Sequence, residues 1–301
     1  MQRYDTNSRS VKNIFKKIRK KRSKRRIFKI KIKIKREDWI FFSKFAKRNS
    51  HKLLTFTQRD FLPLLMKKQS ESSLEYQYAL TIRIDSDGFS LFVSSIQSGS
   101  TLTTKRIDCN FSNQSFETVL DIIDSETRLN CHQIRIIVES NQYVIIPMDF
   151  FKLEDVADLL FLEHKISKTD SILFNRISEF CFVNIFAMPG IIHEALTQLF
   201  PEAEIEHHIS ELITDNVKPN TENCAYCRAR NKMLDIVAVK NSRIHLINSF
   251  QYDTNEDFLY FVLNVYEKLT LEVSKTPLFI YNIEQKADLK SLLEKYIVIG
   301  D

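Results

Sequence analysis

The fold of this chain is decided by the stretch Leu80-Thr-Ile-Arg-Ile-Asp-Ser-Asp-Gly-Phe-Ser-Leu-Phe-Val93. Apolar and polar residues alternate on both sides of Asp87-Gly88, a dipeptide that readily adopts positive φ. This pattern predicts two antiparallel strands joined by a tight turn. A second hairpin is predicted around Asn241-Ser242, where the alternation is similar and the turn signal is weaker. The two hairpins divide the chain into two similar halves.

Each predicted hairpin is followed by the same series of elements. A third extended stretch is expected over 103–107 and 249–252, then a helix, then a strand over 134–138 and 278–281. The helices are recognised by apolar residues at i, i+3, i+4 and i+7, which form one buried stripe. These residues are Phe116, Val119, Leu120 and Ile123 in the first copy and Phe258, Phe261, Val262 and Val265 in the second. The order βββαβ therefore occurs twice, which indicates an internal duplication within an α/β protein with mixed sheets.

The charge of the chain is divided between two segments of opposite sign. Residues 1–65 contain 22 Lys and Arg against 4 Asp and Glu, whereas residues 66–301 contain 22 against 34. We therefore expect a basic extension over 1–65, a first half over 66–214, a polar loop over 215–231 and a second half over 232–301. The last of these is expected to be shortened.

The basic extension has three interpretations. A block of like charge is typical of a disordered, solvated tail. Because the sign of the charge changes near Met66, translation could instead start there, and peptides from 1–65 in the native protein would exclude that idea. A third interpretation is an arm at 11–36 that binds nucleic acid or an anionic membrane face, with an affinity that falls steeply with salt.

Composition excludes several classes of protein. No run approaches the roughly 18 apolar residues that a membrane span requires, and the basic N-terminus is not followed by the apolar region of a secretory signal. The five cysteines are scattered and odd in number, which argues against a disulfide framework. We expect a cytoplasmic protein.

The first hairpin carries a candidate phosphate loop, made of Asp85, Asp87 and Gly88. Backbone amides of a tight turn can hold phosphates, and an aspartate can hold a metal ion through water. The simpler interpretation is an Asp-Gly turn. The whole chain has only four glycines, and each other residue placed at positive φ in a phosphate cradle costs about 1 to 2 kcal/mol. A nucleotide clasp is therefore disfavoured, and no cofactor is expected.

A second candidate is the pair Cys224 and Cys227 in the predicted loop, with His207 and His208 upstream. Cysteine and histidine are zinc ligands, but the spacing is unusual, and incidental cysteines in a surface loop are favoured over a metal site. The remaining histidines form no catalytic pattern with a nucleophile or paired carboxylates. They are His132, His164, His193 and His245.

Two βββαβ units resemble the plan of the superfamily of actin, sugar kinases and heat-shock ATPases. More narrowly, Leu80 to Leu91, Asn141 to Phe151 and Val239 to Phe250 resemble the bacterial domain-of-unknown-function family 3822, over about residues 72 to 301. The segment from Val183 to Leu212 is similar to actin-like proteins of pilus assembly and cell division. The resemblance implies a two-lobed actin-like, ribonuclease H-like fold.

The sequence departs from the ATPases at their nucleotide motifs. Their first phosphate loop has Asp-x-Gly followed by Thr or Ser, where this chain has Asp85-Ser-Asp-Gly-Phe89. The second predicted turn has neither Asp nor Gly, and a Gly-Gly adenosine motif is missing. We therefore expect a non-catalytic actin-like module that binds another macromolecule, an unknown protein. The alternatives are a divergent ATPase or kinase that holds Mg-nucleotide through Asp85 and Gly88, and nucleic-acid binding through 1–65.

Overall fold

The computed structural model describes residues 78–111, 114–127, 131–230, 232–281 and 287–300. The predicted basic extension and Met66 lie outside the described residues. The described chain divides into two compact units. The N-terminal unit comprises 78–176 and 182–208, and the C-terminal unit comprises 177–181 and 209–300.

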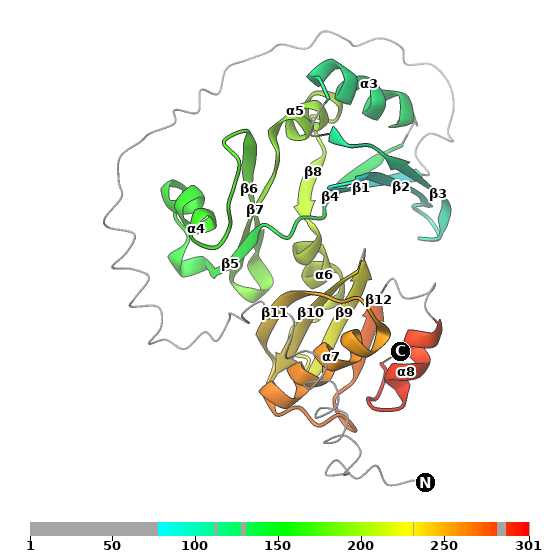
Figure 1. The fold of residues 1–301 in the computed structure, drawn as a ribbon, viewed down its shortest axis with the longest axis vertical. Helices are drawn as coiled ribbons and strands as arrows, with labels where there is room; N and C mark the ends of the chain where they lie inside the picture. The colour runs from blue at the N-terminus through cyan, green and yellow to red at the C-terminus, as the bar shows by residue number, and fades with distance from the viewer. Residues whose placement is uncertain (1–77, 112–113, 128–130, 231, 282–286, 301) are drawn as a thin grey trace. The chain divides into compact units, whose positions relative to one another are not determined.

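The N-terminal unit contains a five-stranded sheet in the order β3-β2-β1-β4-β8 and a three-stranded sheet in the order β5-β7-β6 (Figure 1). The strands of the larger sheet are β1 (Tyr78–Asp85), β2 (Gly88–Ser95), β3 (Thr101–Asp108), β4 (Gln133–Val138) and β8 (Glu204–His207). Those of the smaller sheet are β5 (Tyr143–Pro147), β6 (Asp170–Ile177) and β7 (Phe182–Pro189). The helices are α3 (Phe116–Thr127), α4 (Val156–Glu163) and α5 (Gly190–Leu199), with short 3₁₀ turns η4 (Met148–Phe150) and η5 (Leu153–Asp155).

The C-terminal unit contains a four-stranded sheet in the order β11-β10-β9-β12. Its strands are β9 (Cys224–Arg230), β10 (Met233–Lys240), β11 (Arg243–Gln251) and β12 (Leu278–Tyr281). Its helices are α7 (Asn255–Leu269) and α8 (Ala287–Glu294), with the 3₁₀ turn η6 (Ser178–Phe180). Helix α6 (His208–Asn216) begins at the last residue of the N-terminal unit and continues in this one.

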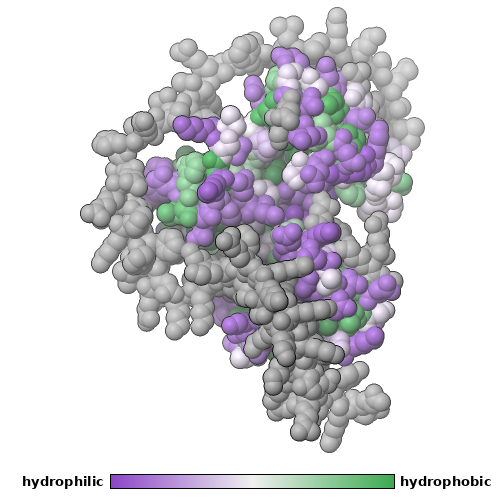
Figure 2. Space-filling view, viewed as in Figure 1, coloured by the Kyte–Doolittle hydropathy of each residue, from purple (hydrophilic) through white to green (hydrophobic). Residues whose placement is uncertain are grey.

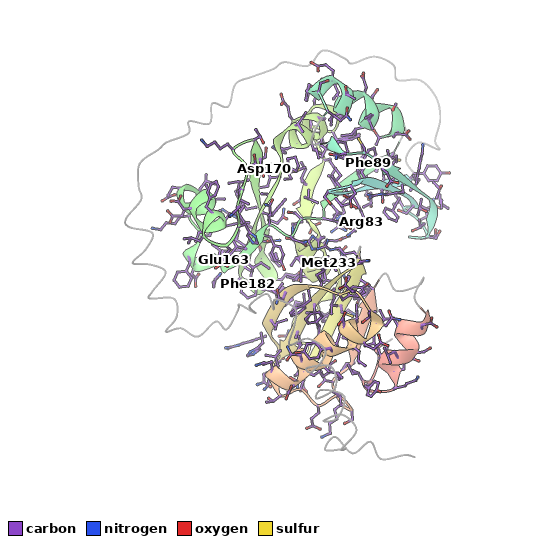
Figure 3. The ribbon with its side chains drawn as sticks, in the orientation of Figure 1. Arg83, Phe89, Glu163, Asp170, Phe182 and Met233 are labelled. Atoms are coloured by element: carbon purple, nitrogen blue, oxygen red, sulfur yellow. The ribbon has the colours of Figure 1, made fainter. Side chains whose placement is uncertain are left out.

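The cores of both units follow from the periodicities of the sequence. Leu80, Ile82 and Ile84 alternate along β1 and are buried in one core with Phe89, which is labelled in Figure 3, and with apolar residues of α3 and α5. In the other unit, the apolar stripe of α7 packs on one face of the four-stranded sheet. Helix α7 starts with a capping box in which Thr254 and Asp257 bind each other's backbone amides, which satisfies N–H groups that have no partner within the helix. The two predicted helices are confirmed.

The strand order shows the duplication directly. The order β3-β2-β1-β4 recurs as β11-β10-β9-β12, and β1 and β9 pair in parallel with β4 and β12. The α/β class with mixed sheets is therefore confirmed, and the recurring strand order agrees with the predicted duplication of βββαβ units.

The second copy starts one strand earlier than the sequence indicated. The predicted loop 215–231 is wrong for Cys224–Arg230, which form β9, and the predicted stretch 249–252 is mostly the end of β11. The Asn241-Ser242 hairpin is present, with φ of 50° and 59°, but it joins β10 to β11. Strand β9 escaped detection because its sequence, CAYCRAR, contains no β-branched residue and two arginines.

Gly88 is required by the close approach of β3 to the β1–β2 turn. Its φ is +144°, and a Cβ there would lie 2.1 Å from the carbonyl oxygen of Ile107. Gly99 also has positive φ, +66°, but no atom lies within 4 Å of its Cβ position. The glycine of the candidate phosphate loop thus has a structural role in packing two strands.

We expect Gly88→Ala to lower the free energy of unfolding by more than about 2 kcal/mol, since it adds a clash to backbone strain. Gly99→Ala, which adds strain alone, should cost about 1 kcal/mol. Urea unfolding of the full chain followed by circular dichroism measures both. Equal losses in the two variants would contradict this account of Gly88.

Candidate functional site

Asp85 lies at the end of β1, where the sequence suggested a phosphate loop, and its carboxylate is fully engaged by the chain itself. Arg106 on β3 donates from Nη1 to Oδ2 at 2.7 Å and from Nη2 to Oδ1 at 2.9 Å. The backbone N–H of Asp87 donates to Oδ1 at 2.8 Å. The side chain of Asp85 is only 10% exposed. Both carboxylate oxygens and one turn amide are therefore already used.

Arg106 is held in place by more than Asp85. Its Nε donates to Asp108 at 2.9 Å, and Nη1 lies 3.4 Å from the hydroxyl of Ser90. The side-chain hydrogen bonds with Asp85, and then with Asp108, raise the pKa of Arg106. A two-pronged guanidinium–carboxylate pair has fixed geometry and is stronger than a neutral hydrogen bond. A metal ion at Asp85 would have to displace a permanent positive charge.

The equivalent turn in the C-terminal unit joins β9 to β10, between Arg230 and Met233. In each unit the second turn residue accepts a backbone hydrogen bond from the residue after the third strand. These bonds are Cys109 N–H to Asp87 O and Tyr252 N–H to Lys232 O, each 2.9 Å. The position that corresponds to Asp85 is therefore Arg230, which has the opposite charge.

A second ion pair lies at this turn. Arg230 donates from Nε to Asp235 Oδ2 at 2.6 Å and from Nη2 to Oδ1 at 3.2 Å. The hydroxyl of Ser249 donates to Asp235 Oδ1 at 2.6 Å. Asp235 is completely buried. Its carboxylate can be buried because β9, the strand that precedes it, supplies its counter-ion.

The same three positions of each unit carry a carboxylate, a guanidinium and a hydroxyl. Ser90 is opposite Arg106 in the strand register, as Asp235 is opposite Ser249, and both Ser90 and Asp235 are third in their strands. In the N-terminal unit the order is Asp85, Ser90, Arg106, and in the C-terminal unit it is Arg230, Asp235, Ser249. The duplicated units thus build the same ionic cluster from permuted residues. The sequence analysis missed Arg106, Arg230 and Ser249, which only the strand register connects to the turns.

The cysteine pair does not form a metal site with its neighbours. Cys224 and Cys227 are both buried in β9, and residues three apart on a strand point to opposite faces. Burial raises the pKa of both thiols, which disfavours the thiolate that binds zinc. Within the described part of the chain, no three His, Cys, Asp or Glu side chains are grouped to hold a metal ion.

The upstream histidines lie at the junction of β8 and α6. His207 Nδ1 is 2.9 Å from Asn184 Nδ2, and His207 Nε2 is 2.9 Å from the carbonyl oxygen of Ser140. Both ring nitrogens of His207 are therefore within hydrogen-bonding distance of groups of the same unit. His208 Nδ1 is 3.3 Å from the carbonyl of Val138. Both rings are buried and pack as part of the unit.

Comparison with known proteins agrees with this architecture. Residues 67–299 match the model of a family described as "Protein of unknown function (DUF3822)". The chain belongs to this family. No curated protein sequence matches it.

A solved structure from Bacteroides thetaiotaomicron, described as a protein with actin-like ATPase fold and unknown function, has a TM-score of 0.60 and 23% identity. The likeness covers 76% of this chain and 92% of the other, so this DUF3822 protein has an actin-like ATPase fold. The cytoplasmic domain of EpsL from the Vibrio cholerae type II secretion system is 9% identical, with a TM-score of 0.39 over 67% of this chain and 81% of that one. The likeness to EpsL is too distant to inform the function.

We expect Asp235→Asn to lower the free energy of unfolding by about 3 to 5 kcal/mol, because it leaves a largely buried guanidinium without its counter-charge. The matched control is Asp108→Asn, whose side chain is 86% exposed and should cost less than about 1 kcal/mol. Urea unfolding followed by circular dichroism compares the two. A loss at Asp235 no larger than that at Asp108 would show that the buried pair is not needed.

Proposed function

We propose that this DUF3822 protein is a cytoplasmic, non-catalytic member of the actin-like fold that acts by binding another protein. The observation that carries the proposal is the pair of ionic clusters at the two β-hairpin turns. In the ATPases that the sequence resembles, these turns hold phosphates. Here each turn is neutralised by its own strand residues.

The charge balance argues against Mg-nucleotide at the first turn. A Mg²⁺ ion brought near Asp85 would meet the guanidinium of Arg106, whose donors occupy both carboxylate oxygens. Two unit positive charges about 4 Å apart repel by about 4 kcal/mol where the effective dielectric constant is about 20, and the double charge of Mg²⁺ raises this to about 8 kcal/mol. The metal would also have to replace three hydrogen bonds to the carboxylate. The binding of a nucleotide with Mg²⁺ would therefore include a large unfavourable electrostatic contribution to its free energy.

The charge at the second turn also argues against Mg-nucleotide. Arg230 stands where the first unit has Asp85, so no carboxylate is present there to hold a metal ion. Its side chain is only 9% exposed, and its charge is neutralised by Asp235. Within the described residues, no helix has the length and apolar character to cross a bilayer. The two neutralised turns fit a protein that binds its partner through its surface, because a fold can persist while its original site is lost.

Isothermal titration calorimetry of the full chain with MgATP and MgADP tests the proposal. We expect no binding at micromolar ligand, and the same result for Asp85→Ala. Micromolar binding by the wild-type chain that is abolished in Asp85→Ala would overturn the proposal in favour of a divergent ATPase or kinase.

A further inference from the structure

Large apolar side chains are exposed together on α4 and the two short turns before it. Leu153, Phe161 and Leu162 are 68%, 50% and 46% exposed, and Phe150 is 45% exposed. Among the described residues, the other exposed large apolar side chains lie outside this stretch. Figure 2 shows hydrophobic side chains gathered over α4, bordered by hydrophilic ones. We call the exposed residues of 149–163 the α4 surface.

Helix α4 is fixed to the N-terminal unit by one face and presents the other to solvent. Val156 and Leu160 are buried in one core cluster with apolar residues of β5 and β7. Asp158 has Phe161 three residues and Leu162 four residues further on, so these three are neighbours on the helix, and all three are exposed. Because a packed helix carries these side chains, a partner would not have to order them first, which reduces the entropic cost of binding.

The charge of the α4 surface is negative. Residues 149–163 contain five acidic residues and one basic residue, Lys152. Arg176 on β6 adds a second positive charge, since its guanidinium carbon lies 5.4 Å from the ring centre of Phe151. Five carboxylates against two cations leave an excess of negative charge around the exposed apolar side chains. The acidic residues are Asp149, Glu154, Asp155, Asp158 and Glu163.

This charge decides which kind of partner fits the α4 surface. A second copy of the chain, docked by twofold symmetry, would bring the same carboxylates against one another. An anionic membrane or a nucleic acid would be repelled by them as well. A protein segment that carries both apolar and basic side chains complements the surface in both respects, because complementary charges favour the correct partner and repel others.

We infer that the α4 surface binds a segment of a partner protein in which apolar side chains are flanked by lysines and arginines. The apolar side chains cover Leu153, Phe161 and Leu162, which removes their surface from water. The basic side chains pair with the carboxylates of Glu154 and Asp158. An amphipathic helix that lays its apolar face on an exposed apolar surface is a common mode of such recognition. The inference rests on the proposed function in one respect, that the partner is a protein.

Selection from a peptide library tests the inference without knowledge of the partner. Random peptides of about 16 residues, or about four helical turns, are displayed on phage and depleted on the full chain carrying Phe161→Asp and Asp158→Lys. The remaining phage are selected on the wild-type full chain. We expect enriched peptides with several large apolar residues and more Lys and Arg than Asp and Glu.

The most enriched peptide is then synthesised with a fluorophore, and its anisotropy is measured against the wild-type chain and single variants. Its dissociation constant should rise at least about tenfold in Phe161→Asp, which removes a central apolar contact. It should rise at least about threefold in Asp158→Lys, because an exposed attraction becomes a repulsion. Added salt should also weaken binding, since it screens exposed charges.

Two controls make the same changes in chemistry at exposed positions of other elements. Leu102→Asp on β3 and Asp121→Lys on α3 should leave peptide binding unchanged. Circular dichroism verifies that each variant is folded, and the two separate α4 substitutions guard against one that fails to fold.

Three results would overturn the inference. They are the absence of any enriched peptide, enriched peptides without an excess of basic residues, and equal weakening of binding by the control and α4 substitutions. The calorimetry with MgATP measures a different property. Nucleotide binding would overturn the proposed function and leave the peptide result intact, and failure of the selection would leave the calorimetric result intact.

Discussion

The salt bridge between Arg106 and Asp85 fixes the conformation of the β1–β2 turn, where the sequence suggested a phosphate loop. It connects the last residue of β1 to β3, two strands away, across the turn that contains Gly88. The same carboxylate also accepts the amide hydrogen bond of Asp87, so it stabilises the turn from within. Strand pairing, turn geometry and charge neutralisation thus depend on one another. Asp85 and the backbone amide of Asp87, which the sequence suggested as part of a phosphate loop, thus stabilise the hairpin.

The two units reach this arrangement with different residues in the same positions. In the N-terminal unit the guanidinium comes from the third strand, whereas in the C-terminal unit it comes from the first, and Asp235 accepts its hydrogen bonds inside the sheet. Burying an unpaired charge costs far more than burying a pair with good geometry. A cluster of one carboxylate, one guanidinium and one hydroxyl therefore persists as a set, although its members are permuted. This requirement for neutrality explains how Arg230 can occur in the inner strand β9, where Asp235 is its counter-ion.

The sequence was sufficient to predict the elements with clear periodicity. Alternation along β1 and β2, the Asp-Gly turn and the stripe of α7 each reflect local rules, and these elements were correctly predicted. Strand β9 was missed because Arg228 and Arg230 look like surface residues in the sequence, and their burial depends on Glu211 and Asp235 from other elements. The ionic clusters could not be predicted for the same reason. The residues of each cluster are brought together only by the register between strands. In addition, because β9 is the first strand of the second copy, the turn that corresponds to Asp87-Gly88 is the one between β9 and β10.

The most direct measurement is a crystal structure of the full chain grown with Mg²⁺ and a non-hydrolysable ATP analogue. We expect Arg106 to remain bound to both oxygens of Asp85, and Arg230 to Asp235, with no metal ion or phosphate at either turn. A Mg²⁺ ion held near Asp85, with Arg106 turned away and phosphates at the β1–β2 turn, would contradict the loss of the nucleotide site.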